Sequence, residues 1–559
     1  MAARPDQYRA EFRADYVIVG AGSAGAVLAA RLTEDPGTRV LLLEAGAGAK
    51  EGAEHWLLKM PLGFLKALFN PAFTWAYKSE PEPHLGGRQL FLPRGKLLGG
   101  SSAINGMFYM RGHSGDFDRW AQKGCHGWSY ADVLPYFLRM ERHWAGADGL
   151  HGGAGPLAVK QNATQHLLHD EVMQAARNAG LPISEDIHVT EEGVARGELT
   201  IDEKGNRAST YAAYLKPAMK RPNLEVVTGA LVERVLLDGR RATGIRFTRS
   251  GEVCEAIAAR EVILSGGSYN SPQLLMLSGI GPAEDLRALG IAVAHDLPGV
   301  GRNLSEHPRV PVEFAAKGAV TFVNQLRFDR AARHVLAWKL FGRGAFAAQV
   351  NSANPILRTD PRLAQPDIQL WCNPVKVGAH LWFPGIKAPP RHEMTTDVIL
   401  LHPQSRGRVS LRSPDPRDFP RIALNIFDNP ADLATARAGI AIARRLYGTP
   451  PLAGLVEREM LPGSHVQSDL ELDEHIRATA QVTQHPVGTC AMGTGPSAVV
   501  DPELRVRGLE ALRVIDASIM PDVPGGNTNA PTIMIGEKGA DMIKADAKVG
   551  AAGVGRQAA

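Results

Sequence analysis

The segment from Asp15 to Glu44 constrains the fold more than any other part of the chain. It reads as a short apolar strand, a turn with Gly20, Gly22 and Gly25, a helix of small residues, and a second strand. Gly20 permits the tight turn, Gly22 lets backbone amides approach a pyrophosphate at the positive helix end, and Gly25 lets helix and strand pack closely. The Glu44 carboxylate can accept a hydrogen bond from a ribose hydroxyl. The order of these parts predicts a dinucleotide-binding β-α-β unit, which could serve NAD, NADP or FAD.

Composition limits the class of protein. The 559 residues are too many for one ordinary hydrophobic core, so we expect two or more lobes. Hydrophobic residues make up 44% and charged residues 21%, as in globular proteins. The net charge of +4 gives no reason to expect nucleic acid or an anionic membrane as a partner.

The cysteines and the amino terminus indicate the compartment. The four cysteines are far apart and form no C-x-x-C pair, so we expect reduced, buried thiols, no metal site and a cytoplasmic location. Residues 1–14 are charged and lack an apolar core, which predicts no secretory signal. No apolar run is long enough to span a bilayer.

Three later segments have the composition of a nucleotide site. Residues 93–107 crowd glycines and hydroxyl residues beside one basic pair, which suits a flat or anionic ligand, although a tight glycine turn is the alternative. Strand-like runs at 224–227, 232–237, 242–248 and 261–264 lead into the glycines of 265–282. The third segment comprises 484–493, a strand at 512–516, and 525–538. Because parallel strands end at the ligand crevice, Asp516 is expected at the nucleotide, and the cofactor lobe is expected to be discontinuous.

The region between about 309 and 480 differs in character. Strand-like runs at 310–315, 368–371, 398–402 and 408–411 predict an antiparallel sheet. Helix-like stretches at 329–341, 431–447 and 469–480 are expected to cover one face of it. The first of these is basic and amphipathic, and two interpretations stay open, a packed lid helix or a peripheral membrane contact.

These motifs together resemble the glucose-methanol-choline oxidoreductase family of flavoproteins over nearly the whole chain. The resemblance implies an α/β fold with a Rossmann-like FAD-binding domain formed by 1–157, 198–308 and 483–546. It implies an α+β substrate domain with an antiparallel sheet, formed by 158–197 and 309–482, and leaves 547–559 as a flexible tail. The cofactor-binding residues that it implies are Gly20, Gly22, Ser23, Gly25, Glu44, Ala45, Gly99, Gly100, Ser101, Asn105, Gly106, Met107, Val232, Asp516, Ala517, Thr528, Asn529 and Thr532.

The family's active-site pair maps onto His485 and Asn529. Taken alone, His485 would be a structural histidine, but its place before Pro-Val-Gly-Thr favours a catalytic role. A neutral imidazole can take the hydroxyl proton of an alcohol while hydride passes from carbon to flavin N5. Asn529 is expected to hydrogen-bond the same oxygen and orient the C–H bond.

Two departures from the family pattern bear on cofactor and substrate. Choline oxidases attach FAD through a histidine where this chain has Ile104, so we expect non-covalent FAD. Enzymes acting on choline have a glutamate where this chain has Arg309, and a cation there would repel choline. Arg309 suits a neutral primary alcohol, or one with an anionic or aldehyde-hydrate group, unless its side chain points to solvent. Substrate-pocket candidates are Arg309, Trp371 and His402.

The resemblance therefore implies FAD-dependent oxidation of a primary alcohol to an aldehyde, with electrons passed to a quinone or another non-oxygen acceptor. An alcohol oxidase that makes hydrogen peroxide is the first alternative. A hydroxynitrile lyase, a fatty-acid photodecarboxylase and a non-catalytic flavin-binding protein are less favoured, since the His/Asn pair is intact and the photodecarboxylase cysteine is missing near His402. Monomer and homodimer both stay open.

Overall fold

The first β-α-β unit forms as the glycine pattern predicts. The computed structural model describes residues 10–557, and in it β1 (Ala10–Val19) leads through Gly20 into α1 (Ser23–Leu32) and then β2 (Val40–Glu44). All five residues of β2 are buried. A continuous apolar run of this kind is typical of a parallel strand covered on both faces.

A seven-stranded sheet surrounds this unit and is assembled from distant parts of the chain. Its order is β10-β11-β12-β1-β2-β9, and β23 pairs with β12. β1 is parallel to β2 and β12, whereas β10, β11 and β12 form an antiparallel meander. The discontinuous cofactor lobe is thereby confirmed. The added strands are β9 (Leu224–Thr228), β10 (Ala230–Asp238), β11 (Arg241–Arg249), β12 (Glu252–Leu264) and β23 (Leu512–Val514).

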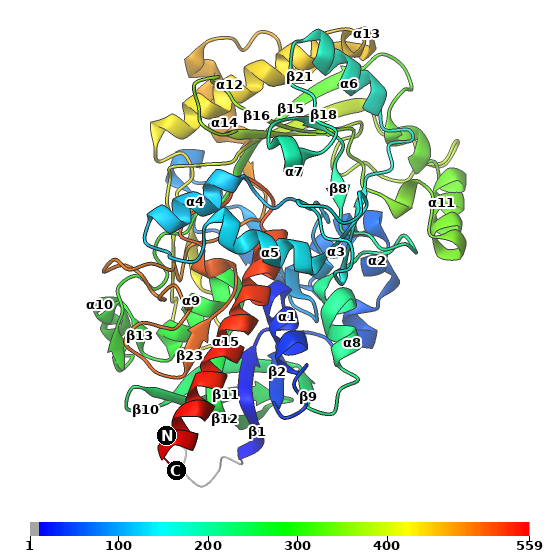
Figure 1. The fold of residues 1–559 in the computed structure, drawn as a ribbon. Helices are drawn as coiled ribbons and strands as arrows, with labels where there is room; N and C mark the ends of the chain where they lie inside the picture. Colours follow the sequence, from blue (N-terminus) through cyan, green and yellow to red (C-terminus); the bar gives the residue numbers. More distant parts are fainter. Residues whose placement is uncertain (1–9, 558–559) are drawn as a thin grey trace.

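The carboxyl-terminal helix closes one side of this sheet. α15 (Asn529–Gln557) packs along α1 and against α5 (Tyr130–Met140), so the last helix lies beside the first (Figure 1). A side chain at Gly536 would approach Ala24 at 3.1 Å, which shows how closely α15 and α1 pack. The segment 547–559 was expected to be a flexible tail; in the structure α15 runs to Gln557. Residues 558 and 559 lie outside the described residues.

The second lobe is built on an antiparallel sheet, as expected. Its order is β21-β15-β18-β17-β16-β7, and β22 pairs with β15. The strands are β7 (Gly193–Ala195), β15 (Pro308–Ala316), β16 (Asn354–Leu357), β17 (Ile368–Asn373), β18 (Glu393–Leu400), β21 (Val456–Leu461) and β22 (Gln481–Val482). The run at 408–411 forms β19 (Arg408–Ser410), which pairs with β20 (Arg421–Ala423) in a separate ribbon.

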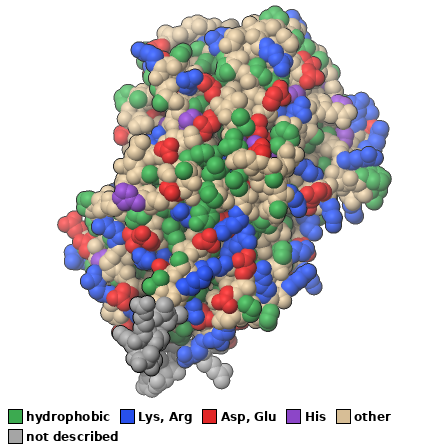
Figure 2. All heavy atoms as spheres, in the orientation of Figure 1, with side chains coloured by type: hydrophobic (Ala, Val, Ile, Leu, Met, Phe, Trp, Pro, Cys, Tyr) green, Lys and Arg blue, Asp and Glu red, His purple; other side chains and the backbone are tan. Residues whose placement is uncertain are grey.

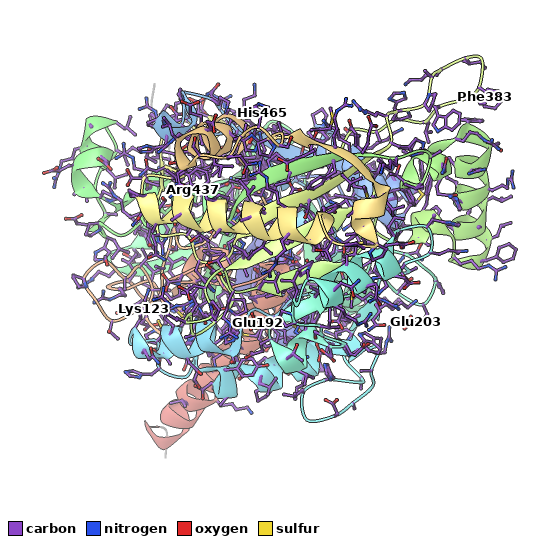
Figure 3. The ribbon with its side chains drawn as sticks, turned by 90° about the horizontal axis from the view of Figure 1, so that it is seen from above. Lys123, Glu192, Glu203, Phe383, Arg437 and His465 are labelled. Atoms are coloured by element: carbon purple, nitrogen blue, oxygen red, sulfur yellow. The ribbon has the colours of Figure 1, made fainter. Side chains whose placement is uncertain are left out.

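Helices cover the outer face of the second sheet. α12 (Pro430–Tyr447) packs on β15, β17 and β18, and α14 (Asp469–Thr479) packs on β15 and α12. Figure 3 shows α12 lying across this sheet. α6 (His169–Asn178) packs beside α12, and α11 (Phe328–Phe341) projects from the side of the lobe. α9 (Gly267–Leu277) packs against β10. The other elements near the first unit are α2 (Trp56–Lys59), α3 (Phe64–Leu68), α4 (Ser114–Gln122) and the ribbon of β3 (Thr74–Lys78) and β4 (Phe91–Gly95).

The surface reflects the modest net charge. On the face shown in Figure 2, cationic and anionic side chains are interspersed over most of the molecule. Within residues 10–557, no helix combines the length and apolarity that crossing a membrane requires.

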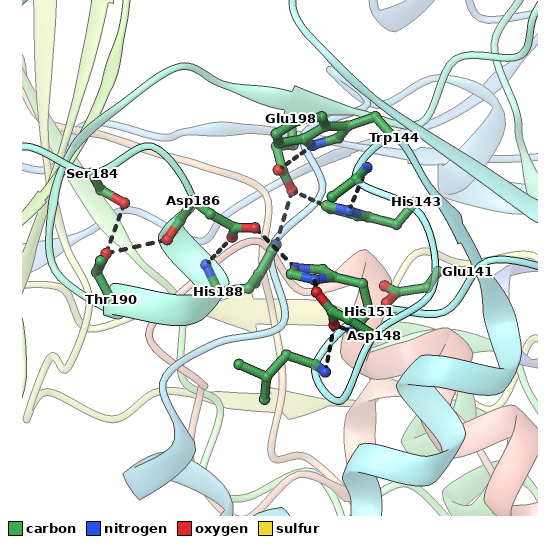
Figure 4. A network of polar contacts seen from close by, with 12 residues as sticks. Glu141, His143, Trp144, Asp148, His151, Ser184, Asp186, His188, Thr190 and Glu198 are labelled. Atoms are coloured by element: carbon green, nitrogen blue, oxygen red, sulfur yellow. Dashed lines mark hydrogen bonds and ion pairs between the residues drawn. The ribbon is translucent and has the colours of Figure 1, made fainter.

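A buried polar network joins segment 141–151 to segment 184–198 (Figure 4). Glu198 is its centre: its carboxylate contacts His143 Nε2 at 3.2 Å and His188 Nε2 at 3.1 Å. Trp144 Nε1 donates to the other Glu198 oxygen at 2.6 Å. The rings of His143 and His151 stack with centroids 4.1 Å apart. Burial alone would raise the pKa of Glu198, but the hydrogen bonds from the two histidines lower it below its usual value.

Candidate active site

A cavity of about 960 Å³ lies between the two sheets. Its floor is formed at the ends of the parallel strands, where Val19, Glu44 and Ser265 line it. Its other wall comes from the antiparallel sheet, through Arg309, Trp371 and Asp397. The volume is at the upper end of the range for cofactor and ligand sites, and the position matches the crevice beyond strand ends.

Two glycine segments meet on the cavity floor. Gly20 has φ +99°, and a Cβ there would lie 2.5 Å from the Ser265 carbonyl oxygen, so only glycine fits. A Cβ at Gly100 would lie 2.6 Å from Gly22 Cα, whereas a Cβ at Gly22 would enter open space. No side chain caps α1 at Gly22. The amides at the start of α1 therefore face a space that suits a pyrophosphate.

Glu44 lies at the end of β2, against the same floor. Its Oε2 accepts from the Ala21 amide at 3.0 Å and its Oε1 accepts from the Gly46 amide at 2.8 Å. Burial raises the pKa of Glu44 to about 7. Each oxygen retains a lone pair, so the carboxylate can still accept from a ribose hydroxyl.

Most of the predicted cofactor-binding residues line the cavity. Gly25 and Gly99 are the two exceptions. A Cβ at Gly25 would lie 1.9 Å from the Gly20 carbonyl oxygen, so Gly25 permits the close packing of α1 that the motif predicts. The residues that do line the cavity are Gly20, Gly22, Ser23, Glu44, Ala45, Gly100, Ser101, Asn105, Gly106, Met107, Val232, Asp516, Ala517, Thr528, Asn529 and Thr532.

Asp516 lines the cavity, but its carboxylate is engaged by the protein. Its Oδ2 accepts from the Gly267 amide at 2.8 Å and from Ser271 Oγ at 2.6 Å, and its Oδ1 accepts from the Ser518 amide at 2.8 Å. Asp516 therefore holds the start of α9 against the end of β23, and its buried side chain braces the cavity wall.

His485 lies in the cavity wall, and its amide partner is Asn527. Asn527 Nδ2 is 3.2 Å from His485 Nε2. The expected partner, Asn529, is the first residue of α15, and its Oδ1 accepts from Ser23 Oγ at 2.8 Å. The amide beside His485 is therefore that of Asn527, two residues before the predicted Asn529. The sequence Asn527-Thr528-Asn529 offers two candidates, and only the turn before α15 decides which one faces the imidazole.

A second histidine, which the sequence did not single out, fixes the tautomer of His485. His307 Nε2 is 3.0 Å from the Leu401 carbonyl oxygen, which accepts only, so this nitrogen carries the proton. In neutral His307 the Nδ1 atom is then the acceptor, and it lies 3.0 Å from His485 Nδ1. His485 Nδ1 must donate, which leaves a lone pair on His485 Nε2, and the Asn527 amide donates to that lone pair. Thr483 Oγ1 also contacts His485 Nδ1 at 2.9 Å.

Burial keeps both imidazoles neutral. It lowers the pKa of His485 to about 3, and burial together with the nearby His485 lowers the pKa of His307 well below its ordinary value. Glu306 lies behind the pair, where its Oε1 accepts from the backbone amides of His485 (2.6 Å) and His307 (2.9 Å). Burial raises the pKa of Glu306 to about 7, and its Oε2 has no hydrogen-bond partner among the described residues.

Two of the three substrate-pocket candidates line the cavity, and the third does not. Arg309 lines the cavity and forms an ion pair with Asp397, Nη1 to Oδ1 at 2.6 Å. Trp371 lines it as well, with its ring 5.0 Å from that of Phe108 in an edge-on contact. His402 is not a lining residue: it lies beyond the end of β18, with its Nε2 3.1 Å from Gln365 Nε2. The structure therefore places His402 outside the set of cavity-lining residues.

A glycine cradle that leads to a buried imidazole and amide defines the site of a dinucleotide-dependent oxidoreductase. Family models described as GMC oxidoreductase match residues 14–309 and 403–536. Mitochondrial choline dehydrogenase of Mus musculus is 44% identical over 537 residues, which cover 95% of this chain and 89% of that protein. Oxygen-dependent choline dehydrogenase of Pseudomonas savastanoi is 42% identical, covering 95% and 93%. Pyridoxine 4-oxidase from Mesorbium loti has a similar structure, with a TM-score of 0.84 and 33% identity over 94% of this chain and 98% of that one. The chain belongs to the GMC oxidoreductase family.

The residues present fit the FAD of this family. The uncapped start of α1 and the open space over Gly22 suit the pyrophosphate, and Glu44 suits the ribose. When bound, FAD supplies the hydride acceptor. His485 and Asn527 supply a neutral proton acceptor and an amide donor at adjacent positions of the wall.

Proposed function

We propose that this protein oxidises a neutral primary alcohol to the aldehyde. The observation that carries the proposal is the lone pair on His485 Nε2 beside the Asn527 amide, in a cavity that also holds the glycine cradle. A bound alcohol would take the place of the Asn527 amide at His485 Nε2 and give that nitrogen its hydroxyl proton. Bound FAD would supply the acceptor for the hydride of the alcohol carbon. The alcohol loses one proton and one hydride and becomes the aldehyde.

The low pKa of His485 determines how the proton moves. A base whose conjugate acid has a pKa of about 3 cannot hold a proton taken from a neutral hydroxyl, whose acidity is close to that of water. The hydroxyl becomes acidic only as the hydride leaves its carbon. We therefore expect the two transfers to occur together, with the Asn527 amide stabilising the partial negative charge on the oxygen.

The cavity wall favours an uncharged substrate. Asp397 pairs with Arg309, so this part of the wall presents a neutral ion pair to the substrate. The indole Nε1 of Trp371 is buried and has no hydrogen-bond partner among the described residues, so it can donate to a substrate oxygen. Position 309 is an arginine and not a carboxylate that could attract a quaternary ammonium. This argues against choline as the preferred alcohol.

We propose that the reduced flavin passes its electrons to a quinone or another non-oxygen acceptor. An oxidase that uses oxygen is the second candidate, since the proteins of similar structure include pyridoxine 4-oxidase. The test is a panel of primary alcohols that includes choline, run once with oxygen alone and once with a dye acceptor. Dye reduction without comparable hydrogen peroxide supports the dehydrogenase, and peroxide at a comparable rate overturns it. Choline as the fastest substrate would overturn the substrate proposal.

We also propose that FAD is bound without a covalent link. Ile104 lines the cavity where a histidine would be needed, and an alkyl side chain cannot form that bond. Acid precipitation should release the flavin into the supernatant. Flavin that stays in the washed pellet would contradict this proposal.

A further inference from the structure

The outer side of α11 is apolar and faces solvent. Phe328, Leu336 and Leu340 are 58%, 55% and 59% exposed, and they follow one another at helical spacing with Ala332 between them. The opposite side of the helix holds Ala331 and Trp338, which are buried. The helix is therefore anchored by one face and presents a second apolar face that no described part of the chain covers.

The loop 375–391 extends this apolar face. Ile386 is 83% exposed, and Val377, Leu381 and Phe383 are exposed as well. The loop is held in place, because the Phe328 amide donates to the Trp382 carbonyl oxygen at 2.9 Å and the rings of Phe328 and Phe383 lie 6.4 Å apart. Figure 3 shows Phe383 at the outer tip of this loop, next to α11.

The mouth of the cavity opens among these residues. Val377 and Leu381 of the loop line the cavity, and so does Val335 of α11. Trp56 of α2 and Phe69, which directly follows α3, also line the cavity and are 53% and 62% exposed. The exposed apolar residues of α2, α3, α11 and the loop thus form a rim around the opening, here called the mouth rim.

The mouth rim is strongly cationic, although the whole chain has a net charge of only +4. Figure 2 shows Lys, Arg and apolar side chains gathered at the edge where α11 lies. Asp329 is the only acid within segments 56–69, 328–343 and 375–391. Outside these segments, Glu313 pairs with Lys376, Glu393 lies 4.0 Å from Arg391, and the exposed Asp418 lines the cavity beside the exposed Arg417. The cations of the three segments are Lys59, Lys66, Arg330, Arg333, Lys339, Arg343, Lys376, Lys387 and Arg391.

We propose that the mouth rim docks on an anionic phospholipid bilayer, so that the cavity opens toward the lipid. Exposed aromatic and aliphatic side chains among Lys and Arg are the composition of surfaces that insert into the headgroup region. A second copy of the chain fits less well, because a twofold contact would place these cations opposite one another. The net charge of the whole chain gives no sign of this partner, because acids elsewhere in the chain cancel the local excess of cations.

The experiment measures binding of the FAD-loaded protein to sedimented vesicles. Vesicles of phosphatidylcholine with phosphatidylglycerol should bind the protein, vesicles of phosphatidylcholine alone should bind it far less, and added salt should weaken binding. Leu340→Glu and Ile386→Glu should each weaken binding at least about tenfold, because each places an anion in the inserted face. Neither residue lines the cavity. Leu340→Gln separates the loss of apolar contact from the added charge and should also weaken binding.

Leu470→Glu is the matched control. Leu470 is 71% exposed on α14, away from the mouth rim, and the substitution makes the same charge change. This variant should bind as the wild type does. The proposal is overturned if the wild type does not bind the anionic vesicles, or if the rim variants bind as the control does. The proposal is also overturned if the wild type forms a dimer that Leu340→Glu dissociates and does not bind vesicles. That result would assign the mouth rim to a second copy of the chain.

Discussion

The two asparagines of the carboxyl-terminal motif can be separated by one pair of substitutions. Asn527→Ala removes the amide next to His485 Nε2, where the substrate oxygen must lie if His485 takes its proton. Removing one preorganised donor to a developing negative charge costs about 10²- to 10³-fold in rate. Asn529→Ala removes a bond to Ser23 Oγ at the start of α1, and a neutral hydrogen bond of this kind contributes about 0.5–1.5 kcal/mol. That loss should weaken retention of FAD and leave the chemical step nearly unchanged.

The assay is anaerobic flavin reduction by a saturating alcohol, followed at the flavin absorbance band by rapid mixing. FAD content and spectrum are measured on the same samples, so that a loss of cofactor is distinguished from a slow reaction. We expect Asn527→Ala to keep its flavin and to lose about 10²-fold or more in reduction rate. The reasoning is refuted if Asn529→Ala shows the large loss in reduction rate while Asn527→Ala reduces flavin nearly as fast as the wild type.

Three further predictions follow from the buried groups. Because burial raises the pKa of Glu306 to about 7 and this carboxyl contacts the amides of both active-site histidines, flavin reduction should change across a pH limb near 7. Glu306→Gln should remove that limb, and an unchanged pH profile in the variant would exclude Glu306 as its source. Deuterated alcohol and heavy water should both slow the same reduction step, and their effects should multiply, since proton and hydride move together; a substrate effect without a solvent effect would indicate separate steps. The lowered pKa of Glu198 means that the unfolded chain binds the proton more readily, so this stabilisation is fully present above the usual value of 4.5 and is lost as pH falls below it. Glu198→Gln should therefore lose less free energy of unfolding than the wild type as pH falls from neutral to acid, as measured by urea unfolding. A pH dependence equal to that of the wild type would contradict this assignment.

The sequence predicted those parts of the site that depend on local backbone geometry. Gly20 and Gly22 are required by a tight turn and a close approach of the backbone, which are properties of a few consecutive residues. The apolar runs of β1 and β2 and the alternation in β15 and β17 likewise identify strands from local pattern alone. For this reason the strands and the dinucleotide turn could be predicted from local pattern, whereas His485 was singled out through the resemblance of its motif to the family.

The tertiary structure decided which side chains meet. Asn527 and Asn529 are two residues apart in a glycine-rich turn, and only the start of α15 sets which one faces His485. His307 and His485 are 178 residues apart, so no local spacing along the chain could pair them. Arg309 is neutralised by Asp397 of the neighbouring strand β18, and that pairing depends on sheet register.

The same limit applies to the surface. The sequence showed a basic amphipathic helix at 329–341 and left its partner open, because an amphipathic pattern does not say what covers the apolar face. Packing of Trp338 inward leaves Phe328 and Leu340 outward, beside the cavity mouth. Local sequence thus determined the dinucleotide cradle, because the cradle depends on short-range backbone geometry, and the resemblance of its motif to the family singled out His485. The tertiary structure alone decided the partners of that imidazole and the character of the mouth rim, because these depend on contacts between segments far apart along the chain.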